Sequence, residues 1–560
     1  MSKLPWRPVD HWLAATQAPP DGPTRALLAR LYGPDETLWA ARTRLWRAAL
    51  TAWRAAYGQG DVLLARAPGR ISLNPHSDHQ GCFVLYGCHA REMVVVAGRR
   101  DDDRFRLVNA DPAYADDLAF GLREELDRAP AAWARGWTDY LEDHAVKAAV
   151  AAQRDPKSRG SGRRGTLNYV KAAVLRLAAA CPDAPWHGLD LALAGDIPPA
   201  AGQSSSSAIV TATALALRAV WDLALDDREL VALLGEAEWY VGTRGGSGDH
   251  AAMLLGARGQ MVNVRFEPPV RVLEQRSVAF PSGYQVLLAN SGVRSEKSSA
   301  EKRLFNRGVF AYKFAFAELR RILSERRSDL GLDEATVDGT RCLADLHDPR
   351  LPLGVLYELL LALAPETSPT VLRRRYPELF DAAARSFFDT DDPTLLPVGV
   401  PLRGAALYGL GRADRGLVQD RLLAAGNPEA MVEFGRLCSI THDGDRRFVL
   451  GADGALAPYR ANLDALADDA LRRAQTAGLP LRRQAGYYGA SIGELDRIVD
   501  LVTPLPGVLG AGLMGAGGGG VVLIVAHDDP RVTATVAAAL DSAVAGLERW
   551  VPAAGAGVLA

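Results

Sequence analysis

Residues 65 to 87, ARAPGRISLNPHSDHQGCFVLYG, place charged and imidazole side chains between two apolar segments. Arg70 follows a Pro-Gly pair, and His76, Asp78 and His79 come shortly after it. The stretch is therefore either a solvated loop or a polar pocket held between two strands. A metal site built from the two histidines and the aspartate is a further interpretation, but no cysteine or second carboxylate motif supports it.

A second stretch with chemical potential is GDIPPAAGQSSSSAIVTATALAL, where four serines lead from a turn into an apolar helix. Gly202 permits a sharp turn, and the N–H groups at the helix start face outward with the helix dipole behind them. Such a terminus binds phosphate, and serine hydroxyls add donors or a magnesium ligand. A serine N-cap explains one of the four residues, so a cap and a phosphate loop both remain open. The pattern matches neither a P-loop nor a dinucleotide fingerprint.

Glycines crowd residues 510 to 522, GAGLMGAGGGGVV, directly before the apolar run VVLIVA. A flexible linker would not normally run into a segment that must be buried. The glycines therefore predict a close approach of two backbones, or of backbone and ligand. Tight packing beneath another domain explains them as well.

Asp249 stands between the glycine-rich GGSG and the apolar helix AAMLLG. A carboxylate at this place can cap the helix or orient a reacting hydroxyl, and the residues alone favour neither role.

The elements that must position these residues follow from periodicity. Helical spacing of apolar residues occurs in residues 24 to 57 and in LNYVKAAVLRLAAA. Strands are predicted at 61 to 67, at 83 to 97 and at GLDLALAG. The first strand is expected to break at Pro68-Gly69-Arg70. Residues 101 to 165 read as irregular, with a basic surface loop in QRDPKSRGSGRRGT, and 325 to 400 read as irregular and partly helical. Helices dominate from 420 until the final apolar strand. Since strands and helices mix without regular alternation, the fold class is α+β.

Composition restricts the class of protein. The 560 residues exceed one ordinary core and predict two domains. A net charge of -2 gives no support to nucleic-acid or membrane binding, and no apolar run suits a signal peptide or a membrane span. The five cysteines form no CxxC pair, which argues against a disulfide framework and a structural zinc site. A cytoplasmic enzyme is the expectation.

The motifs and their order resemble the GHMP kinase superfamily, and within it galactokinase and its sugar-kinase relatives. APGRISLNPHSDHQG is similar to the galactokinase signature APGRVNLIGEHTDYNGG with one residue missing, and GQSSSSA to GLSSSAA. The resemblance extends over most of the chain through NYVKA, GTRGGSGDHAAMLLG, NSGVRSEKSSAEKR, FGRLCSITHDG, YYGASIGELDRIV and GLMGAGGGG. Residues 101 to 165 and 325 to 400 have no clear counterpart and are expected to be insertions.

This resemblance implies two α+β domains, residues 1 to 285 and 286 to 560, with the active site in the cleft between them. It also implies ATP and Mg²⁺ as cofactors, and transfer of the γ-phosphoryl group to a sugar hydroxyl, usually the anomeric C1 hydroxyl. Arg70 falls on the arginine that stabilises the transferring phosphoryl group, and Asp249 on the catalytic aspartate. His76 and Asp78 fall on sugar ligands. The nucleotide loop comprises Gly202, Gln203, Ser204, Ser205, Ser206 and Ser207, with Ser205 as the magnesium ligand.

Departures from the family pattern concern the sugar. Pro75 stands where galactokinases carry a glutamate that accepts a hydrogen bond from the C6 hydroxyl, and Lys302 stands where they carry a tyrosine. With the glutamate acceptor absent and the Lys302 ammonium present, the site is expected to favour a negatively charged group at C6, such as the carboxylate of galacturonate. The DHQG turn also resembles that of galacturonokinases. Gly512 replaces an arginine of the family's glycine-rich turn, which weakens any nucleotide contact predicted there.

Two other functions remain open from the sequence. One is a non-catalytic sugar and ATP sensor on the galactokinase fold, and the other is a GHMP kinase for a non-sugar alcohol. The presence of both Arg70 and Asp249 with an unbroken serine loop favours an enzyme. The expected partners are a small sugar and ATP, and the sequence does not set the oligomeric state.

Overall fold

The structure is a computed structural model of the 560-residue chain. It describes residues 6–17, 20–73, 75–76, 80–114, 118–153, 165–199, 201–242, 245–268, 270–294, 299–388, 398–541, 543–544 and 546–559, with residues 299–305 described by their backbone alone.

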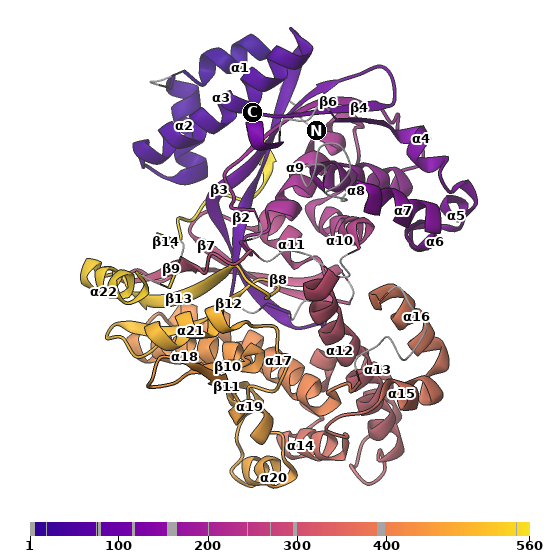
Figure 1. Cartoon of the computed structure of the whole chain (residues 1–560), viewed down its shortest axis with the longest axis vertical. Coiled ribbons are helices and arrows are strands. Elements are labelled where there is room, and N and C mark those ends of the chain that lie inside the picture. Colours follow the sequence, from indigo (N-terminus) through magenta and orange to yellow (C-terminus); the bar gives the residue numbers. More distant parts are fainter. Residues whose placement is uncertain are drawn as a thin grey trace.

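The larger of the two main sheets is built around the long neighbouring strands β2 and β3. Its central order is β1-β2-β3-β6-β4-β5, with β15 paired to β2, β7 to β3, and β8 to β7. The pairs are antiparallel except β4 with β6. The bounds are β1 Arg7–Pro8, β2 Asp61–Ser72, β3 Phe83–Arg99, β4 Arg104–Asn109, β5 Leu118–Gly121, β6 Leu189–Gly195, β7 Gln260–Glu267, β8 Arg271–Ala279 and β15 Gly557–Val558. Strands from both ends of the described chain thus meet on β2 (Figure 1).

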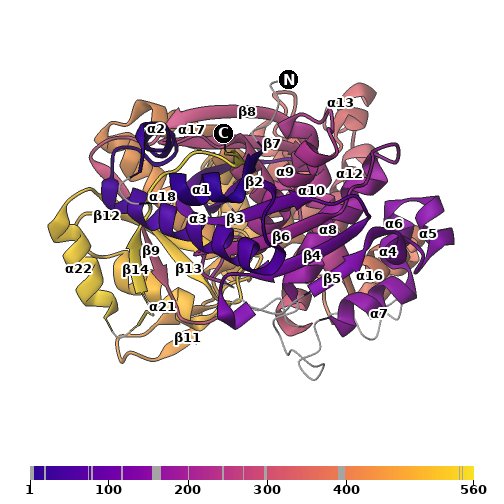
Figure 2. The same ribbon diagram turned by 90° about the horizontal axis from the view of Figure 1, so that it is seen from above.

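Helices cover both faces of this sheet, as Figures 1 and 2 show. On strand β6, Leu189, Leu191 and Leu193 belong to one buried cluster, whereas Ala192 and Ala194 belong to the cluster on the opposite face. The alternation of side chains along a strand separates the two cores. The alanine face packs against α1 Val9–Ala15, α2 Gly22–Tyr32 and α3 Glu36–Tyr57, and the leucine face against α8 Gly165–Ala180, α9 Ser205–Val220, α10 Asp227–Ala237 and α11 Gly248–Leu255.

Three expectations about local structure were wrong. Strand β2 does not break at Pro68-Gly69-Arg70 but continues through a β-bulge at Pro68/Gly69, which absorbs the proline in the ladder. The helical segment 24 to 57 is two helices, because Gly33 adopts a positive φ of 82° between α2 and α3.

Residues 101 to 165 are not irregular where the structure describes them. They form β4, β5, α4 Leu122–Leu126, α5 Pro130–Arg135, α6 Trp137–Glu142 and α7 His144–Ala152. Most of the basic segment that follows lies outside the described residues.

The second main sheet has the order β12-β13-β9-β14 and is antiparallel throughout. Its strands are β9 Tyr284–Asn290, β12 Val508–Met514, β13 Val521–His527 and β14 Gly546–Arg549, and its neighbours include α18 Pro428–Asp445, α21 Gly493–Val502 and α22 Pro530–Leu540. Helix α18 and strand β12 touch backbone to backbone, because a Cβ on Gly510 would lie 1.9 Å from the carbonyl oxygen of Gly435. Gly512 also faces this helix, with its Cβ position 3.0 Å from the Cys438 carbonyl oxygen.

A helical layer completes the second half of the chain, in the lower part of Figure 1. It contains α12 Ser299–Glu325, α13 Glu334–Gly339, α14 Leu353–Ala362, α15 Pro369–Arg375, α16 Pro377–Phe388, α17 Leu402–Ala425, α19 Ala461–Asp464 and α20 Asp468–Thr476, with the hairpin β10 Phe448–Leu450 and β11 Leu456–Pro458. The partly helical nature of residues 325 to 400 is confirmed. No helix among the described residues has the length and apolarity needed to cross a membrane.

The two sheets share a buried core. Ile71 and Leu85 of the first sheet pack in one cluster with Leu288 and Leu523 of the second. The α+β prediction is therefore confirmed, and the loops that follow β2 and β6 lie where the two halves meet.

Candidate active site

Arg70 and Asp249 form an ion pair where strand β2 meets helix α11. Arg70 Nε donates to Asp249 Oδ1 at 2.6 Å, and a terminal guanidinium nitrogen donates to the carbonyl oxygen of Gly202 at 2.5 Å. The Arg70 side chain is 6% exposed and that of Asp249 is 34% exposed. The carboxylate therefore reaches solvent, while the guanidinium is held beneath it by two acceptors.

The ionisation of Asp249 follows from this pairing. Burial acts to raise its pKa, but the charge of Arg70 and the hydrogen bonds from Arg70 and Ser204 outweigh burial and lower the pKa to about 2. Asp249 lies in the first turn of α11, with Ser247 at the N-cap position, so it does not cap this helix. An ionised carboxylate of such low basicity can orient a hydroxyl and balance a cation, but it removes a proton poorly at neutral pH.

The serine loop arrives at the same place from the end of strand β6. The backbone N–H of Arg70 donates to the carbonyl oxygen of Gln203 at 3.3 Å. Ser204 has a left-handed backbone, with φ of 62°, at the N-cap position of α9, yet no side chain caps this helix among the described residues. The Ser204 hydroxyl instead donates to Asp249 Oδ2 at 2.5 Å. The N-terminal N–H groups of α9 thus lie beside the ion pair without a cap, which suits an anion.

The four serine side chains divide into two kinds. The Ser207 hydroxyl donates to Glu238 Oε1 at 2.6 Å, and the Ser204 hydroxyl donates to Asp249. Both of these hydroxyls are therefore hydrogen-bonded to carboxylates of the protein. Ser205 and Ser206 are half-buried, and within the described part of the chain their hydroxyls have no hydrogen-bond partner. These two hydroxyls are the ones that a ligand can engage.

The glycine-rich turn between β12 and β13 packs on the serine loop. Gly515, Gly517, Gly518, Gly519 and Gly520 all have positive φ. A Cβ on Gly202 would lie 2.8 Å from the Met514 carbonyl oxygen, and one on Gly520 would lie 2.9 Å from the Ala201 carbonyl oxygen. The close approach of two backbones predicted for this stretch is confirmed, and it joins the two halves of the chain at the serine loop.

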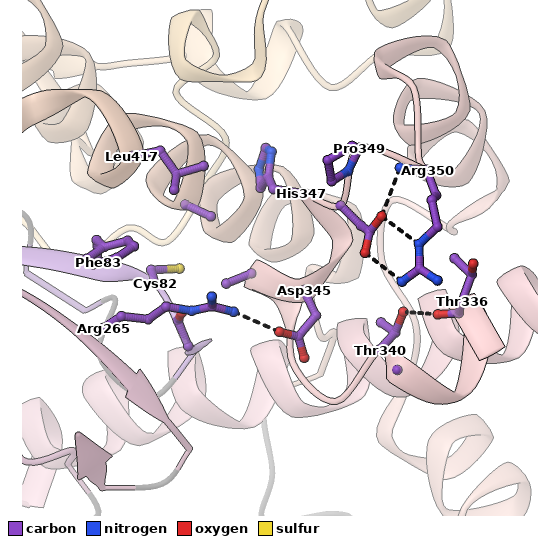
Figure 3. A pocket seen from close by; sticks show the side chains of 15 residues that line it. Cys82, Phe83, Arg265, Thr336, Thr340, Asp345, His347, Pro349, Arg350 and Leu417 are labelled. Atoms are coloured by element: carbon purple, nitrogen blue, oxygen red, sulfur yellow. Dashed lines mark hydrogen bonds and ion pairs between the residues drawn. The ribbon is translucent and has the colours of Figure 1, made fainter. Parts of the chain in front are cut away.

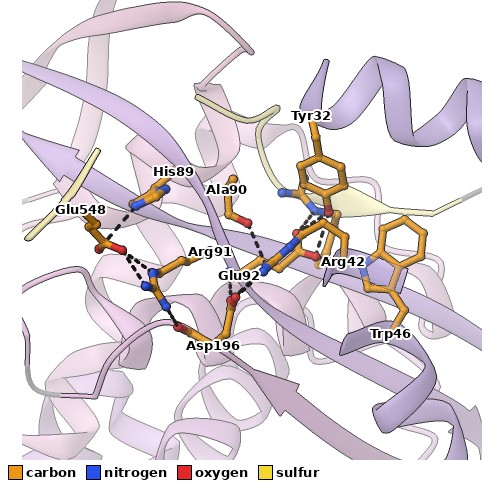
Figure 4. A network of polar contacts seen from close by, with 10 residues as sticks. Tyr32, Arg42, Trp46, His89, Ala90, Arg91, Glu92, Asp196 and Glu548 are labelled. Atoms are coloured by element: carbon orange, nitrogen blue, oxygen red, sulfur yellow. Dashed lines mark hydrogen bonds and ion pairs between the residues drawn. The ribbon is translucent and has the colours of Figure 1, made fainter. Parts of the chain in front are cut away.

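A polar network contacts the serine loop at both ends, and Figure 4 shows the part of it around Glu92, Asp196 and Glu548. At its end, Gln203 Nε2 donates to Glu548 Oε1 at 2.9 Å, and Glu548 pairs with Arg91 at 2.6 Å. At its start, Asp196 pairs with Arg42 and accepts from the backbone N–H of Glu92 at 2.8 Å. Burial acts to raise the pKa of Glu548, but hydrogen bonds from His89, Gln203 and Arg91 lower it to about 2.

The same network is anchored on a buried carboxylate. Glu92 is fully buried and accepts from Arg66 Nε at 2.6 Å, from Trp46 Nε1 at 2.8 Å and from the hydroxyl of Tyr32. Arg66 in turn donates to the carbonyl oxygens of Ala554 and Gly555. Sequence reasoning missed these groups, because they come from distant parts of the chain and form no local motif.

The predicted sugar ligands are only partly described. His76 is 6% exposed and has a positive φ of 64°. Its ring stacks on Tyr488 at 4.6 Å between centroids, and its Nδ1 lies 3.4 Å from both the Tyr408 hydroxyl and Asp445 Oδ1. Asp78 and His79 lie outside the described residues, as does the side chain of Lys302, whose backbone belongs to α12. Pro75 is buried.

A cavity of about 290 Å³ lies between the start of β3, β7, α13 and α17 (Figure 3). Its charged side chains pair with one another: Arg265 binds Asp345 at 3.0 Å, and Arg350 binds Asp348 at 2.7 Å. Because these charges are balanced within the wall, they offer no net attraction to an ionic ligand.

Two family models match parts of the chain that hold the candidate site. The model described as GHMP kinases N terminal domain matches residues 168–257, and the one described as GHMP kinases C terminal matches residues 460–544. The first range holds the serine loop and Asp249, and the second holds the glycine-rich turn. A galactokinase of Chloroflexus aggregans (strain MD-66 / DSM 9485) is 27% identical over 247 residues, which are 44% of this chain and 53% of the relative. The match thus spans about half the length of that protein.

The fold has a counterpart among solved structures. The crystal structure of Lactococcus lactis galactokinase complexed with galactose matches with a TM-score of 0.56 at 19% identity, covering 90% of this chain and 97% of that one. At this identity the likeness establishes the fold. The chain thus matches both GHMP kinase domain models and is similar to galactokinases, in sequence over part of its length and in fold over most of it.

Proposed function

We propose that this protein is an ATP-dependent sugar kinase that transfers the γ-phosphoryl group to the anomeric C1 hydroxyl of a galactose-like monosaccharide. The observation that carries the proposal is the Arg70–Asp249 ion pair beside the uncapped N-terminus of α9. Phosphoryl transfer needs a fixed cation, an anion-binding wall and a group that orients the acceptor hydroxyl, and these are the parts present.

The ion pair performs the acceptor side of the reaction. The partly exposed carboxylate of Asp249 accepts a hydrogen bond from the C1 hydroxyl. This bond orients the hydroxyl oxygen toward the γ-phosphorus of ATP. The charge of Arg70 lowers the pKa of that carboxylate, so the hydroxyl is bound by an anion. The same guanidinium lies where negative charge grows on the transferring group, and a planar fork stabilises that charge better than an ammonium.

The serine loop performs the nucleotide side. The N–H groups of the first turn of α9 bind the phosphates of ATP, and the hydroxyls of Ser205 and Ser206 add donors. The glycine-rich turn and the Glu548 clamp fix the loop before the nucleotide arrives, which lowers the ordering cost of binding.

The residues present fit a magnesium ion, because the Ser205 hydroxyl has no partner within the described residues and the Glu238 carboxylate lies behind the same loop. When bound, Mg²⁺ would neutralise phosphate charge during the transfer. Ser205 is the proposed ligand. Among the described residues, no group of three or more histidine, cysteine or acidic side chains could hold a metal ion.

The test of the function is Asp249→Asn in an ATP-consumption assay with a panel of free sugars. We expect a folded protein whose turnover is lower by orders of magnitude, because a neutral amide neither orients the hydroxyl nor balances Arg70. Asp227→Asn is the matched control, since Asp227 also lies in the first turn of a helix and pairs with an arginine, Arg218, at 2.7 Å. Near-normal turnover of Asp249→Asn would reduce Asp249 to a structural residue, and inactivity of the wild type on every sugar would favour a sensor.

The proposed sugar carries a modified C6, with galacturonate as the sharpest candidate. The side chain of Pro75 offers no acceptor to a C6 hydroxyl, and Lys302 offers a cation to a carboxylate. A charge-assisted contact favours the acid by roughly tenfold to a hundredfold. Kinetics on galactose, galacturonate, arabinose and fucose, with wild type and Lys302→Met, test this preference. Galactose-selective turnover that is indifferent to the lysine would contradict it.

A further inference from the structure

A small cavity of about 70 Å³ lies in the second half of the chain, between α12, the start of α17 and the segment Tyr487–Gly489. Its lining includes Arg307 of α12, Arg447 beyond the end of α18, and the rings of Tyr487 and Tyr488. None of the lining residues that the structure describes is acidic. The cavity therefore differs in charge from the larger one of Figure 3, where each arginine faces a carboxylate.

Neither guanidinium in this cavity has a carboxylate partner within the described residues. Arg307 donates to the carbonyl oxygen of Gly399 at 3.3 Å, and Glu366, which packs against Gly399, forms no ion pair with it. The guanidinium of Arg447 contacts the neighbouring ring of Phe448 at 5.6 Å. The acids near this end of α18 bind other side chains: Asp443 and Asp500 bind Arg446, Asp445 binds Arg412, and Asp496 binds His442 and the backbone N–H of Arg447. Two arginines, Arg307 half-buried and Arg447 exposed, thus line one cavity, and no carboxylate among the described residues pairs with either.

The volume sets the size of the occupant. About 70 Å³ exceeds the roughly 30 Å³ of one water molecule. It is far below the roughly 300–1,000 Å³ of pockets that enclose a whole drug-sized ligand. The space suits one carboxylate or phosphate group with a water molecule, and such a planar or tetrahedral oxyanion is the partner that guanidinium groups bind best.

The wall of the cavity touches the candidate active site. Tyr488 lies over α12, because Gly308 has no side chain: a Cβ there would lie 2.1 Å from the tyrosine ring. The Tyr488 ring also stacks on His76, which is a proposed sugar ligand. Two residues further on, the Ala490 carbonyl oxygen accepts from the N–H of Gly518 in the glycine-rich turn at 3.0 Å. An occupant of the cavity is therefore one aromatic ring away from the proposed sugar site.

We propose that this cavity is an oxyanion subsite in which Arg307 and Arg447 bind one carboxylate- or phosphate-type group. The group has two possible sources. It is either an acidic substituent of the sugar substrate, a source that rests on the proposed sugar-kinase function, or a free anion that binds on its own and acts on the site through Tyr488.

Calorimetry distinguishes these sources without any need for turnover. The proteins are wild type, Arg307→Met and Arg447→Met, and the probes are galactose, galacturonate and inorganic phosphate at constant ionic strength. Arg320→Met is the matched control, because Arg320 is an exposed arginine of the same helix that does not line the cavity. The serine loop can also bind phosphate, so the informative quantity is the part of phosphate binding that the arginine variants lose.

If the anion is an acidic substituent of the sugar, galacturonate binds wild type, and its affinity falls about tenfold to a hundredfold in both cavity variants. The affinity for galactose then stays constant. A free anion predicts the same loss for phosphate with no change for either sugar. Either pattern, with Arg320→Met behaving as wild type, supports the subsite. Equal affinities for all three probes in wild type and both cavity variants would overturn it. An absence of ATP consumption alongside either pattern would reject the kinase function and leave the subsite standing.

Discussion

Gln203 and Glu548 are joined by a 2.9 Å hydrogen bond across 345 positions of sequence. Gln203 precedes the left-handed Ser204 at the start of α9, and Glu548 belongs to the edge strand β14 of the other sheet. The conformation of the serine loop is therefore set partly from the second half of the chain, through a carboxylate that also binds Arg91.

Replacement of this carboxylate tests the clamp. In Glu548→Gln we expect the KM for ATP to rise about tenfold, because the charge-assisted contact with Arg91 is lost and the loop is less ordered. The KM for sugar should stay unchanged, since Arg70 and Asp249 keep their own contacts. Asp528→Asn is the control, because it removes the exposed ion pair with Arg549 of the same strand. An equal rise in both KM values would point to general loosening of the fold.

The hydroxyls of Ser205 and Ser206 give a second prediction. Ser205→Ala and Ser206→Ala should each weaken ATP binding several-fold, since these hydroxyls have no protein partner within the described residues that would need replacement. Ser205→Leu should abolish ATP binding by calorimetry while the far-ultraviolet circular dichroism spectrum stays unchanged. Unaltered affinity in Ser205→Leu would remove the loop from the nucleotide site.

Asp249 should make stability depend on acid pH. Its pKa of about 2 in the folded protein lies below its ordinary value of 3.8. Ionisation therefore stabilises the fold fully above about pH 4, and this stabilisation is lost as the pH falls toward 2. Ser204→Gly keeps the positive φ but removes one hydrogen bond to the carboxylate. Because the unfolded pKa is the same in both proteins, we expect the Tm of this variant, measured from pH 2 to 5, to start its decline at the same pH as wild type, to fall by less, and to level off at a higher pH. Superimposable profiles would contradict the assigned bond.

The buried ion pair of Arg66 and Glu92 should matter for stability. Glu92→Gln leaves a buried guanidinium without its counter-charge, and loss of one partner of such a pair costs about 3–5 kcal/mol. Urea unfolding measures this loss. Glu124→Gln provides the comparison, because its ion pair with Arg128 is exposed and long, at 3.9 Å, and should contribute less than about 1 kcal/mol. Similar urea midpoints for Glu92→Gln and Glu124→Gln would show that the buried Arg66–Glu92 pair contributes no more to stability than the exposed pair.

The sequence predicted the α+β class and the motifs that the structure brings together at Asp249. Arg70 and Asp249 are 179 residues apart, and only the resemblance to a family linked them. The glycine-rich turn was predicted to permit a close backbone approach, and its partner, Gly202, emerged from the structure.

Other features depend on contacts that no local pattern records. A Pro-Gly pair usually ends a strand, but pairing with β3 carries β2 through a bulge. Residues 104–109 join the first sheet beside β6 with Phe105 and Leu107 buried, although the short alternation in RFRL lies within a stretch rich in charge. The clamp on the serine loop unites residues near positions 42, 91, 196 and 548, so its charges can be paired only once the chain is folded.

The pairing of β15 with β2 has a consequence for protein synthesis. Arg66 sits in the ladder of a strand made early, yet it donates to the carbonyl oxygens of Ala554 and Gly555, and β15 closes on the same strand at Gly557 and Val558. While a ribosome is still adding the second half, the nascent first half exposes an uncovered strand edge and a guanidinium without two of its acceptors. The finished sheet therefore forms after translation has passed residue 558, and a stalled or truncated chain would present that edge to chaperones and to other chains.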